Sequence, residues 1–234
     1  YKYALSSGKY IFAPTNEMKC YGKAIKKEIE FSWHCPNYYY HLLPSGHIGA
    51  IKKHIDSDWF MTADIKDFFY QINQSKITRS LNKLFHNYDK SREIAKLSTV
   101  LSVFNGRKIW HIPYGFPQSS IISSVCLKTS FLGAFLEKLE KQGYVISVYV
   151  DDIIISGKIE SYNPNLKKEF LEAAKKSNLM LNPKKTHLSK SKITVFNINL
   201  THLHTKIEKE RRKEFFMKLN NTDVPDNSKI AIKK

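Results

Sequence analysis

Cysteine and long apolar runs are scarce in this sequence, and each shortage narrows what the chain can be. Cys20, Cys35 and Cys126 form an odd-numbered set without a Cys-x-x-Cys pair, which argues against a disulfide framework and for a reducing compartment. Their spacing to nearby histidines fits no tetrahedral zinc pattern. No stretch reaches the roughly 20 uninterrupted apolar residues that cross a bilayer. Two aspartates interrupt even the most apolar run, residues 145–156. We therefore expect a soluble, folded protein with no membrane segment.

The length of 234 residues, 42% of them hydrophobic, is sufficient for one large domain or two small ones. No internal repeat, low-complexity run or proline-rich linker divides the chain, so we predict one continuous architecture. The sequence begins at Tyr1 without an initiator methionine or a signal sequence. We therefore expect an excised piece of a longer protein.

Positive charge is abundant, although arginine contributes little of it. The net charge is +17, and the arginines are Arg79, Arg92, Arg107, Arg211 and Arg212. An excess of cations favours a polyanionic partner such as nucleic acid, because it neutralises phosphates and releases counterions. Abundant lysine beside asparagine and isoleucine is equally explained by biased codon usage. Charge alone leaves both explanations open.

Hydrophobic periodicity predicts a mixture of helices and strands, and hence an α+β protein. The predicted helices are one with Asn16 as its N-cap, and residues 45–55, 77–85, 94–103, 118–139 and 166–179. The predicted strands are residues 9–12, 59–63, 108–112, 145–149 and 153–155, with a strand or strand pair at 193–200. The helix at 118–139 is the longest, and we expect it to back a sheet.

The segment Tyr149-Val150-Asp151-Asp152 joins two strands rich in valine and isoleucine, which predicts a tight hairpin. Adjacent carboxylates at such a turn repel each other unless a cation lies between them. A divalent metal would resolve this conflict. An ordinary acidic turn is the alternative interpretation.

A second acid, Asp64, ends the predicted strand at 59–63 just before an aromatic helix start. It could be a simple N-cap. Two-metal phosphoryl transfer, however, needs carboxylates from separate strands to converge on ions about 3.5–4 Å apart. Asp64 and Asp151 can supply them.

With both acidic segments present in this order and separation, the sequence resembles the reverse transcriptase family, including bacterial retron and group II intron enzymes. The resemblance spans nearly the whole chain. It implies a right-hand polymerase fold with fingers, an antiparallel palm sheet backed by helices, and a partial or absent thumb. It also implies that Asp64, Asp151 and Asp152 are catalytic and bind two divalent metal ions, Mg²⁺ or alternatively Mn²⁺.

The same resemblance implies a set of nucleotide-binding residues. Phe69 matches the aromatic steric gate that excludes a nucleotide 2′-hydroxyl. Residues 115–119 resemble the Pro-Gln-Gly motif beside the incoming nucleotide, with Gln118 informative and Ser119 in place of the usual glycine. The family's substrate site further implies Ile65, Phe68 and Tyr149.

Two lysines fall at positions where the family places charge. Residues 182–186 resemble a later palm motif whose lysine is proposed to protonate pyrophosphate, which makes Lys185 a candidate general acid. A surface lysine is the alternative. Lys9 lies in a segment similar to an Arg-x-Ile-x-x-Pro finger motif, which implies a triphosphate contact.

The resemblance also divides the chain. It implies fingers at 1–60 and 74–113, palm at 61–73 and 114–200, and the start of a thumb at 201–234. Residues 196–200 fall at the primer grip, without its common glycine. A basic helix at 207–219 is then either the first thumb helix along nucleic-acid phosphates or a solvated helix face.

The expected function is an RNA-directed DNA polymerase that uses an RNA template, a DNA or RNA primer and dNTPs. Tyr149 and Phe69 favour deoxynucleotides over an RNA polymerase of related fold. The variation at 118–120 and 196–197 favours a bacterial defence-associated or retron-like enzyme in the cytoplasm. A template-independent nucleotidyltransferase and a non-catalytic nucleic-acid-binding scaffold are the alternatives. An accessory protein or an oligomer is left open.

Overall fold

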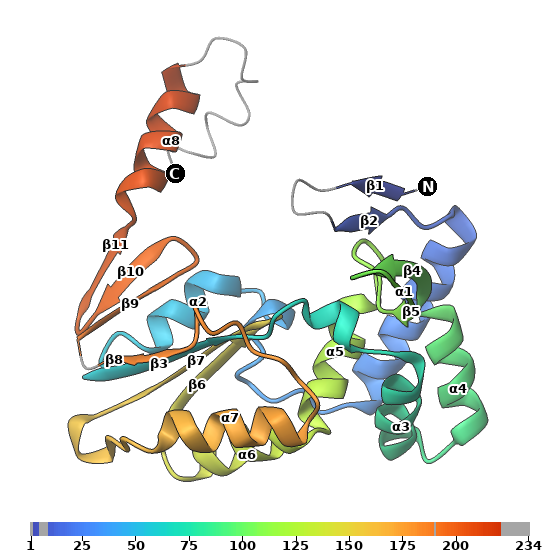
Figure 1. Ribbon diagram of the computed structural model, residues 1–234, viewed down its shortest axis with the longest axis horizontal. Coiled ribbons are helices and arrows are strands. Elements are labelled where there is room, and N and C mark those ends of the chain that lie inside the picture. The colour runs from blue at the N-terminus through green and yellow to red at the C-terminus, as the bar shows by residue number, and fades with distance from the viewer. Residues whose placement is uncertain (1, 5–8, 190, 221–234) are drawn as a thin grey trace.

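An antiparallel sheet lies at the centre of the fold (Figure 1). The computed structural model describes residues 2–4, 9–189 and 191–220. The central sheet has the order β6-β7-β3-β8, with β3 at Trp59–Asp64, β6 at Val145–Tyr149, β7 at Asp152–Gly157 and β8 at His187–Ser189. Every residue of β3 is buried, including the polar Thr62 and the charged Asp64.

Helices cover this sheet on both faces. On one face lie α6 (Phe131–Lys141) and α7 (Leu166–Lys176), and on the other lies α2 (Gly46–Lys53) (Figure 1). Alternate strand residues point to opposite faces. Accordingly Ile153 packs in the larger core beneath the sheet, whereas its neighbour Ile154 packs above with Phe60 and Ile51. The sheet edge that carries the acidic residues is therefore anchored from both sides.

A helical region adjoins the sheet at one end. It contains α1 (Asn16–Ser32), α3 (Gln74–Phe85), α4 (Tyr88–Leu97) and α5 (Ser119–Lys128). Two hairpins accompany these helices, β1 (Lys2–Ala4) with β2 (Tyr10–Phe12), and β4 (Val100–Phe104) with β5 (Arg107–His111). Short 3-10 turns lie at Tyr40–Leu42, Phe68–Gln71 and Ile159–Ser161. The mixture of helices and antiparallel sheets confirms the α+β prediction.

The described chain ends in a second small sheet and a helix. Strands β9 (Lys192–Val195), β10 (Ile198–Thr201) and β11 (His204–Ile207) form a meander that leads into α8 (Lys209–Asn220). The sequence predicts a strand or a strand pair at 193–200 and a basic helix at 207–219, and the structure has a strand pair and a helix here. Helix α8 and the β1–β2 hairpin rise on the same side of the molecule (Figure 1).

The predicted helix at 118–139 is wrong as a single element. It is two helices, α5 and α6, bent by 72°. Ser130 starts the second helix, because its side chain accepts a hydrogen bond from the Gly133 amide. Gly133 lies so close to the end of α5 that an added Cβ would come within 2.2 Å of the Leu127 carbonyl oxygen. Apolar periodicity continues across the bend and therefore concealed it.

Other boundaries also differ from the predictions. The helix expected at 94–103 ends at Leu97, and Val100–Phe104 forms a strand instead, since β-branched and aromatic residues favour pairing in a hairpin. The cap of α1 is Thr15 rather than Asn16, because the Thr15 side chain accepts from the Met18 amide.

No single helix in the described ranges is long and apolar enough to span a membrane. The bent pair α5–α6 meets the length and composition requirement only when the two helices are taken together.

A buried histidine ties α2 to the central sheet. The ring nitrogens of His54 lie 2.6 Å from Ser156 Oγ and 2.8 Å from Ser147 Oγ. Burial, with the nearby Lys53 charge, lowers the pKa of His54 to about 3. The ring is therefore neutral in the folded protein at neutral pH.

His54 should make folding weaker in mild acid. Between its folded pKa near 3 and an unfolded value near 6.5, the unfolded chain binds a proton that the folded chain excludes, so stability falls as pH falls through 6.5. Between pH 7.5 and 5 this amounts to about 2 kcal/mol. In urea titrations, the parent should lose about that much more unfolding free energy over this range than His54→Gln. Equal losses would show that His54 protonates without unfolding.

Candidate active site

Two strand ends bring the predicted acids together. Asp64 is the last residue of β3 and Asp152 is the first of β7, and the two are direct cross-strand partners. The amide of Ile65 donates to the Asp151 carbonyl at 2.9 Å. The β3–β7 register therefore brings Asp64 beside Asp151 and Asp152 at one end of the two central strands, although Asp64 is far from them in sequence.

The turn that carries these acids has an unusual backbone. Val150 has φ of +59°, in the left-handed region that a β-branched side chain rarely adopts. Tyr149 and Asp152 pair across it, so only Val150 and Asp151 form the loop. This geometry matches the twist of a two-residue hairpin, but it costs about 1–2 kcal/mol in a residue of this type.

His41, in the 3-10 turn Tyr40–Leu42, holds the Val150–Asp151 turn in place. Its Nδ1 accepts from the Val150 amide at 3.0 Å, and its Nε2 donates to Ser124 Oγ at 2.7 Å. The tautomer follows from Ser124, whose hydroxyl already donates to the Ser120 carbonyl. Burial lowers the pKa of His41 to about 4, so the ring is neutral. Sequence reasoning missed this role, because no spacing links His41 to Val150.

Crowding and burial make the Asp151 and Asp152 carboxylates resist ionisation. Burial, together with repulsion from Asp64, raises the pKa of Asp151. Burial, then repulsion from Asp151 and Asp64, raises the pKa of Asp152 to about 6. Like charges held in this way favour a bound cation.

Lys185 supplies one such cation. Its Nζ lies 2.7 Å from Asp64 Oδ2, and this hydrogen bond raises the pKa of Lys185. Oxygen donors of this kind suit Mg²⁺ and Mn²⁺. Nevertheless, among the described residues no three Asp, Glu, His or Cys side chains converge as a ready metal group. The donor chemistry fits a divalent ion, which Asp64, Asp151 and Asp152 would hold, and the Lys185 ammonium is paired with Asp64.

A hollow of about 420 Å³ opens beside the carboxylates. Asp152, Lys184 and Lys185 line it together with Phe196 and Asn197. These last two residues form the β9–β10 turn, and both have positive φ, as a two-residue hairpin loop requires. The segment expected as a primer grip therefore faces the acidic cluster.

Comparison with known proteins decides the family. The family model described as "Reverse transcriptase (RNA-dependent DNA polymerase)" matches residues 6–200, most of the chain. This chain belongs to the reverse transcriptase family. It is 22% identical over 194 residues to the Retron Ec48 reverse transcriptase of Escherichia coli, covering 80% of this chain and 45% of that protein.

Solved structures of the family's fold agree. The telomerase of Candida albicans, in complex with a TWJ fragment of telomeric RNA, superposes with a TM-score of 0.58 at 14% identity, over 87% of this chain and 42% of that one. The corresponding Candida tropicalis complex gives 0.51 at 14% identity, over 83% and 37%. The right-hand polymerase fold is thus confirmed. The chain spans less than half the length of these relatives.

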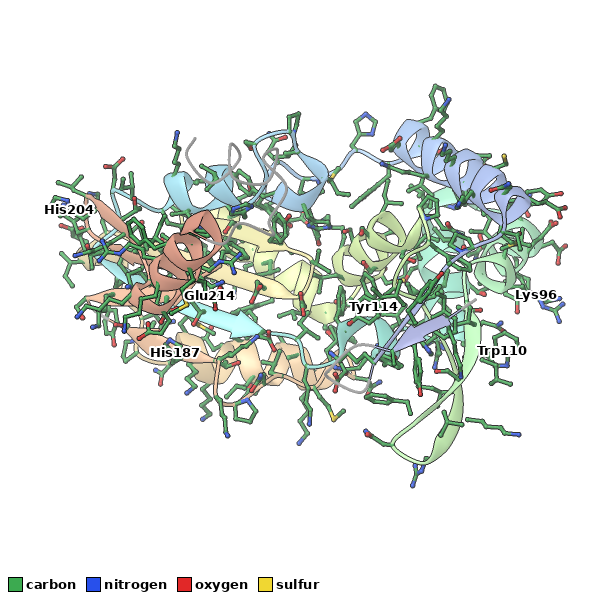
Figure 2. All side chains as sticks on the ribbon, turned by 90° about the horizontal axis from the view of Figure 1, so that it is seen from above. Lys96, Trp110, Tyr114, His187, His204 and Glu214 are labelled. Atoms are coloured by element: carbon green, nitrogen blue, oxygen red, sulfur yellow. The ribbon has the colours of Figure 1, made fainter. Side chains whose placement is uncertain are left out.

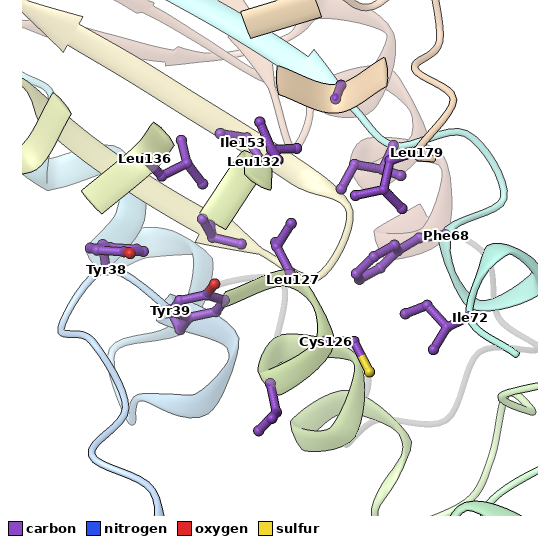
Figure 3. Close-up of a cluster of buried hydrophobic side chains, with 14 of the residues drawn as sticks. Tyr38, Tyr39, Phe68, Ile72, Cys126, Leu127, Leu132, Leu136, Ile153 and Leu179 are labelled. Atoms are coloured by element: carbon purple, nitrogen blue, oxygen red, sulfur yellow. The ribbon is translucent and has the colours of Figure 1, made fainter. Parts of the chain in front are cut away.

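Aromatic residues of the family's substrate site have different surroundings. The ring of Phe69 packs 4.8 Å from that of Tyr114, which lies near the middle of the molecule viewed from above (Figure 2). Phe68 is buried in the core beside Ile72 and Leu179 (Figure 3). Ile65 is likewise fully buried. The side chains of Ile65 and Phe68 thus belong to the hydrophobic core beneath the site.

Of the remaining residues predicted to bind the nucleotide, Tyr149 and Lys9 lie near the acids, and Gln118 lies away from them. Tyr149 packs 5.2 Å from Phe196, beside the acidic turn. Lys9 pairs with Asp67 at 2.8 Å, and although burial opposes its charge, this bond raises the pKa of Lys9. Gln118, in contrast, is fully buried between helices. Its Nε2 lies 3.3 Å from Ser98 Oγ, and the structure does not direct it toward the carboxylates.

Removing the His41 ring should loosen the acidic turn. In His41→Ala the Val150 amide loses its acceptor, so the free energy of unfolding should fall by about 1–3 kcal/mol. Ser123→Ala is a matched control, because this buried hydroxyl bonds only to the Ser120 carbonyl of its own helix, and it should cost under about 1 kcal/mol. Urea denaturation measures both. Equal losses would mean that His41 does not support the turn.

Proposed function

We propose that this chain is the catalytic part of an RNA-directed DNA polymerase, which adds dNTPs to a DNA or RNA primer along an RNA template. The observation that carries the proposal is the gathering of Asp64, Asp151 and Asp152 at one end of the central strands, where Asp64 is buried, the other two are half-buried and the three repel one another. Carboxylates from separate strands are the arrangement that two-metal phosphoryl transfer needs.

Asp64, Asp151 and Asp152 would hold two divalent ions, Mg²⁺ or alternatively Mn²⁺. Bound there, the ions would supply charge neutralisation for the triphosphate and activation of the primer hydroxyl. Release of Lys185 from Asp64 would free that carboxylate. The displaced ammonium, already protonated and 61% exposed, is then available to donate a proton to pyrophosphate.

Two further residues would position the nucleotide. Phe69, held against Tyr114, would press on the ribose where a 2′-hydroxyl sits. Lys9 would exchange its ion pair with Asp67 for the triphosphate. In this proposal residues 1–60 and 74–113 form the fingers, 61–73 and 114–200 the palm, and 201–234 the start of a thumb, of which 221–234 lie outside the described residues.

The biological setting belongs to the same proposal. Similarity to a bacterial retron enzyme supports a retron-like element or anti-phage defence in the bacterial cytoplasm. A template-independent nucleotidyltransferase and a non-catalytic scaffold are distinguished from templated synthesis by the sequence of the product, or by its absence.

The test is synthesis from a primed RNA with Mg²⁺ or Mn²⁺ and labelled dNTPs, followed by sequencing of the product. Asp151→Asn keeps the shape of the side chain and removes its charge, so the rate should fall by roughly a thousandfold or more. Stability without metal should hold or rise, because a repulsive pair has been relieved. Asp56→Asn, an exposed acid away from the turn, should leave the rate unchanged. Near-parent synthesis by Asp151→Asn would contradict the proposal, and so would its failure to fold.

Phe69 should set the choice of sugar. In Phe69→Val the ribose gains space, so rNTP incorporation relative to dNTP should rise at least tenfold, measured by single-nucleotide addition. Phe68→Val is the control, since it removes the same atoms from the neighbouring ring. Both rings are buried, but Phe68 lies beside Ile72 and Leu179, whereas Phe69 packs against Tyr114. An unchanged ratio in an active Phe69→Val enzyme would remove the gate role.

A further inference from the structure

A second basic hollow lies between α3 and α4, outside the site described above. Its volume is about 360 Å³, and its lining includes Arg79, Arg92, Lys96 and Tyr88. The other lining residues are uncharged, so three cations face this hollow without a lining carboxylate. Such a site repels cations and attracts anions.

The arginines of this hollow are unusual in two respects. The chain uses arginine at only five positions against many lysines, yet two of the five meet here. Across the described residues, neither Arg79 nor Arg92 forms an ion pair or a hydrogen bond with another protein group. Both planar forks are therefore available to bind an external ligand.

The basic surface continues across α3, away from α4. Arg79 also lines an adjoining hollow of about 440 Å³, together with Lys83 and Lys176. The two hollows thus meet at Arg79, and α3 itself contains no acidic residue. The result is a basic track from Lys96 across α3 to the end of α7. An extended polyanion fits this track better than a single small anion does.

This track is separate from the carboxylates. The cations that act on the pKa values of Asp151 and Asp152 are Lys185 and Lys9, and none comes from the track. Helices α3 and α4 lie at the lower right of Figure 1, whereas the β1–β2 hairpin and α8 lie at its top. Viewed from above, Lys96 lies at the margin of the molecule, away from Tyr114 (Figure 2).

We propose that the α3–α4 hollow binds the phosphates of a single-stranded nucleic acid, at a place separate from the hollow beside the carboxylates. Arginine forks match phosphate oxygens in pairs. Tyr88, which is 59% exposed at the rim, offers a ring on which an unpaired base stacks. The site needs no polymerase activity, so it stands apart from the proposed function.

The test compares two double variants that each remove two positive charges. Arg79→Gln/Arg92→Gln removes the forks, whereas Lys138→Gln/Lys168→Gln removes exposed lysines of α6 and α7 that do not line the hollow. Binding of fluorescent (rU)20 and (dT)20 is measured by anisotropy over a range of salt. The arginine variant should bind at least tenfold more weakly, with a salt slope smaller by about 1.4, the value for two phosphate contacts on a single strand. The lysine variant should stay within about twofold.

Equal losses in the two double variants would overturn the proposal, since only net charge would then matter. Weakening with both oligonucleotides supports a phosphate site for either strand, and weakening with (rU)20 alone supports one that also reads the 2′-hydroxyl. Tyr88→Phe should retain affinity and Tyr88→Ala should lose it. Photocrosslinks from 4-thiouridine should map to the α3–α4 peptides. Crosslinks confined to the palm would place the strand elsewhere and overturn the proposal.

Discussion

The repulsion among Asp64, Asp151 and Asp152 is the constraint on which the rest of the structure depends. Three carboxylates crowded together, one buried and two half-buried, are unfavourable, and the β3–β7 register and the two-residue turn keep them together. Cores on both faces of the sheet make that register costly to change, since a shift by one residue would move side chains that fit one core into the other core. The packing on both faces of the central sheet therefore stabilises the strands against the repulsion among the three carboxylates.

The surrounding groups are arranged to make this contact tolerable in different ways. Lys185 forms an ion pair with Asp64 and so offsets part of the negative charge. His41 acts on the backbone instead, since it supplies the acceptor that the strained Val150 amide needs. Both groups are half-buried or exposed, so each can respond when a substrate changes the local charge. The site thus combines a rigid frame of strands with one exposed counter-charge, Lys185, and one neutral hydrogen-bond acceptor, His41.

The sequence predicted the parts of this site that depend on local pattern. Strand propensity located β3, β6 and β7, and their ends located the three acids. It could not predict the role of His41 or the position of Gln118. Both depend on how α5 and the Tyr40–Leu42 turn pack against the rest of the protein. The bend between α5 and α6 was hidden for the same reason, as it depends on close approach of Gly133 to the Leu127 carbonyl. Local periodicity has no access to such contacts between elements.

The packing of Gln118 also has a consequence for how this chain can diverge. A Cβ at Gly22 would lie 2.3 Å from Gln118 Oε1, closer than real contacts allow. The helix α1 position and the family-motif position are thus locked to each other across the interior. Relatives that keep a glutamine packed in this way are confined to glycine at the partner position, and a larger residue there is expected only where the glutamine is replaced or turned aside. Variation at one of these positions would therefore report on the orientation of the other.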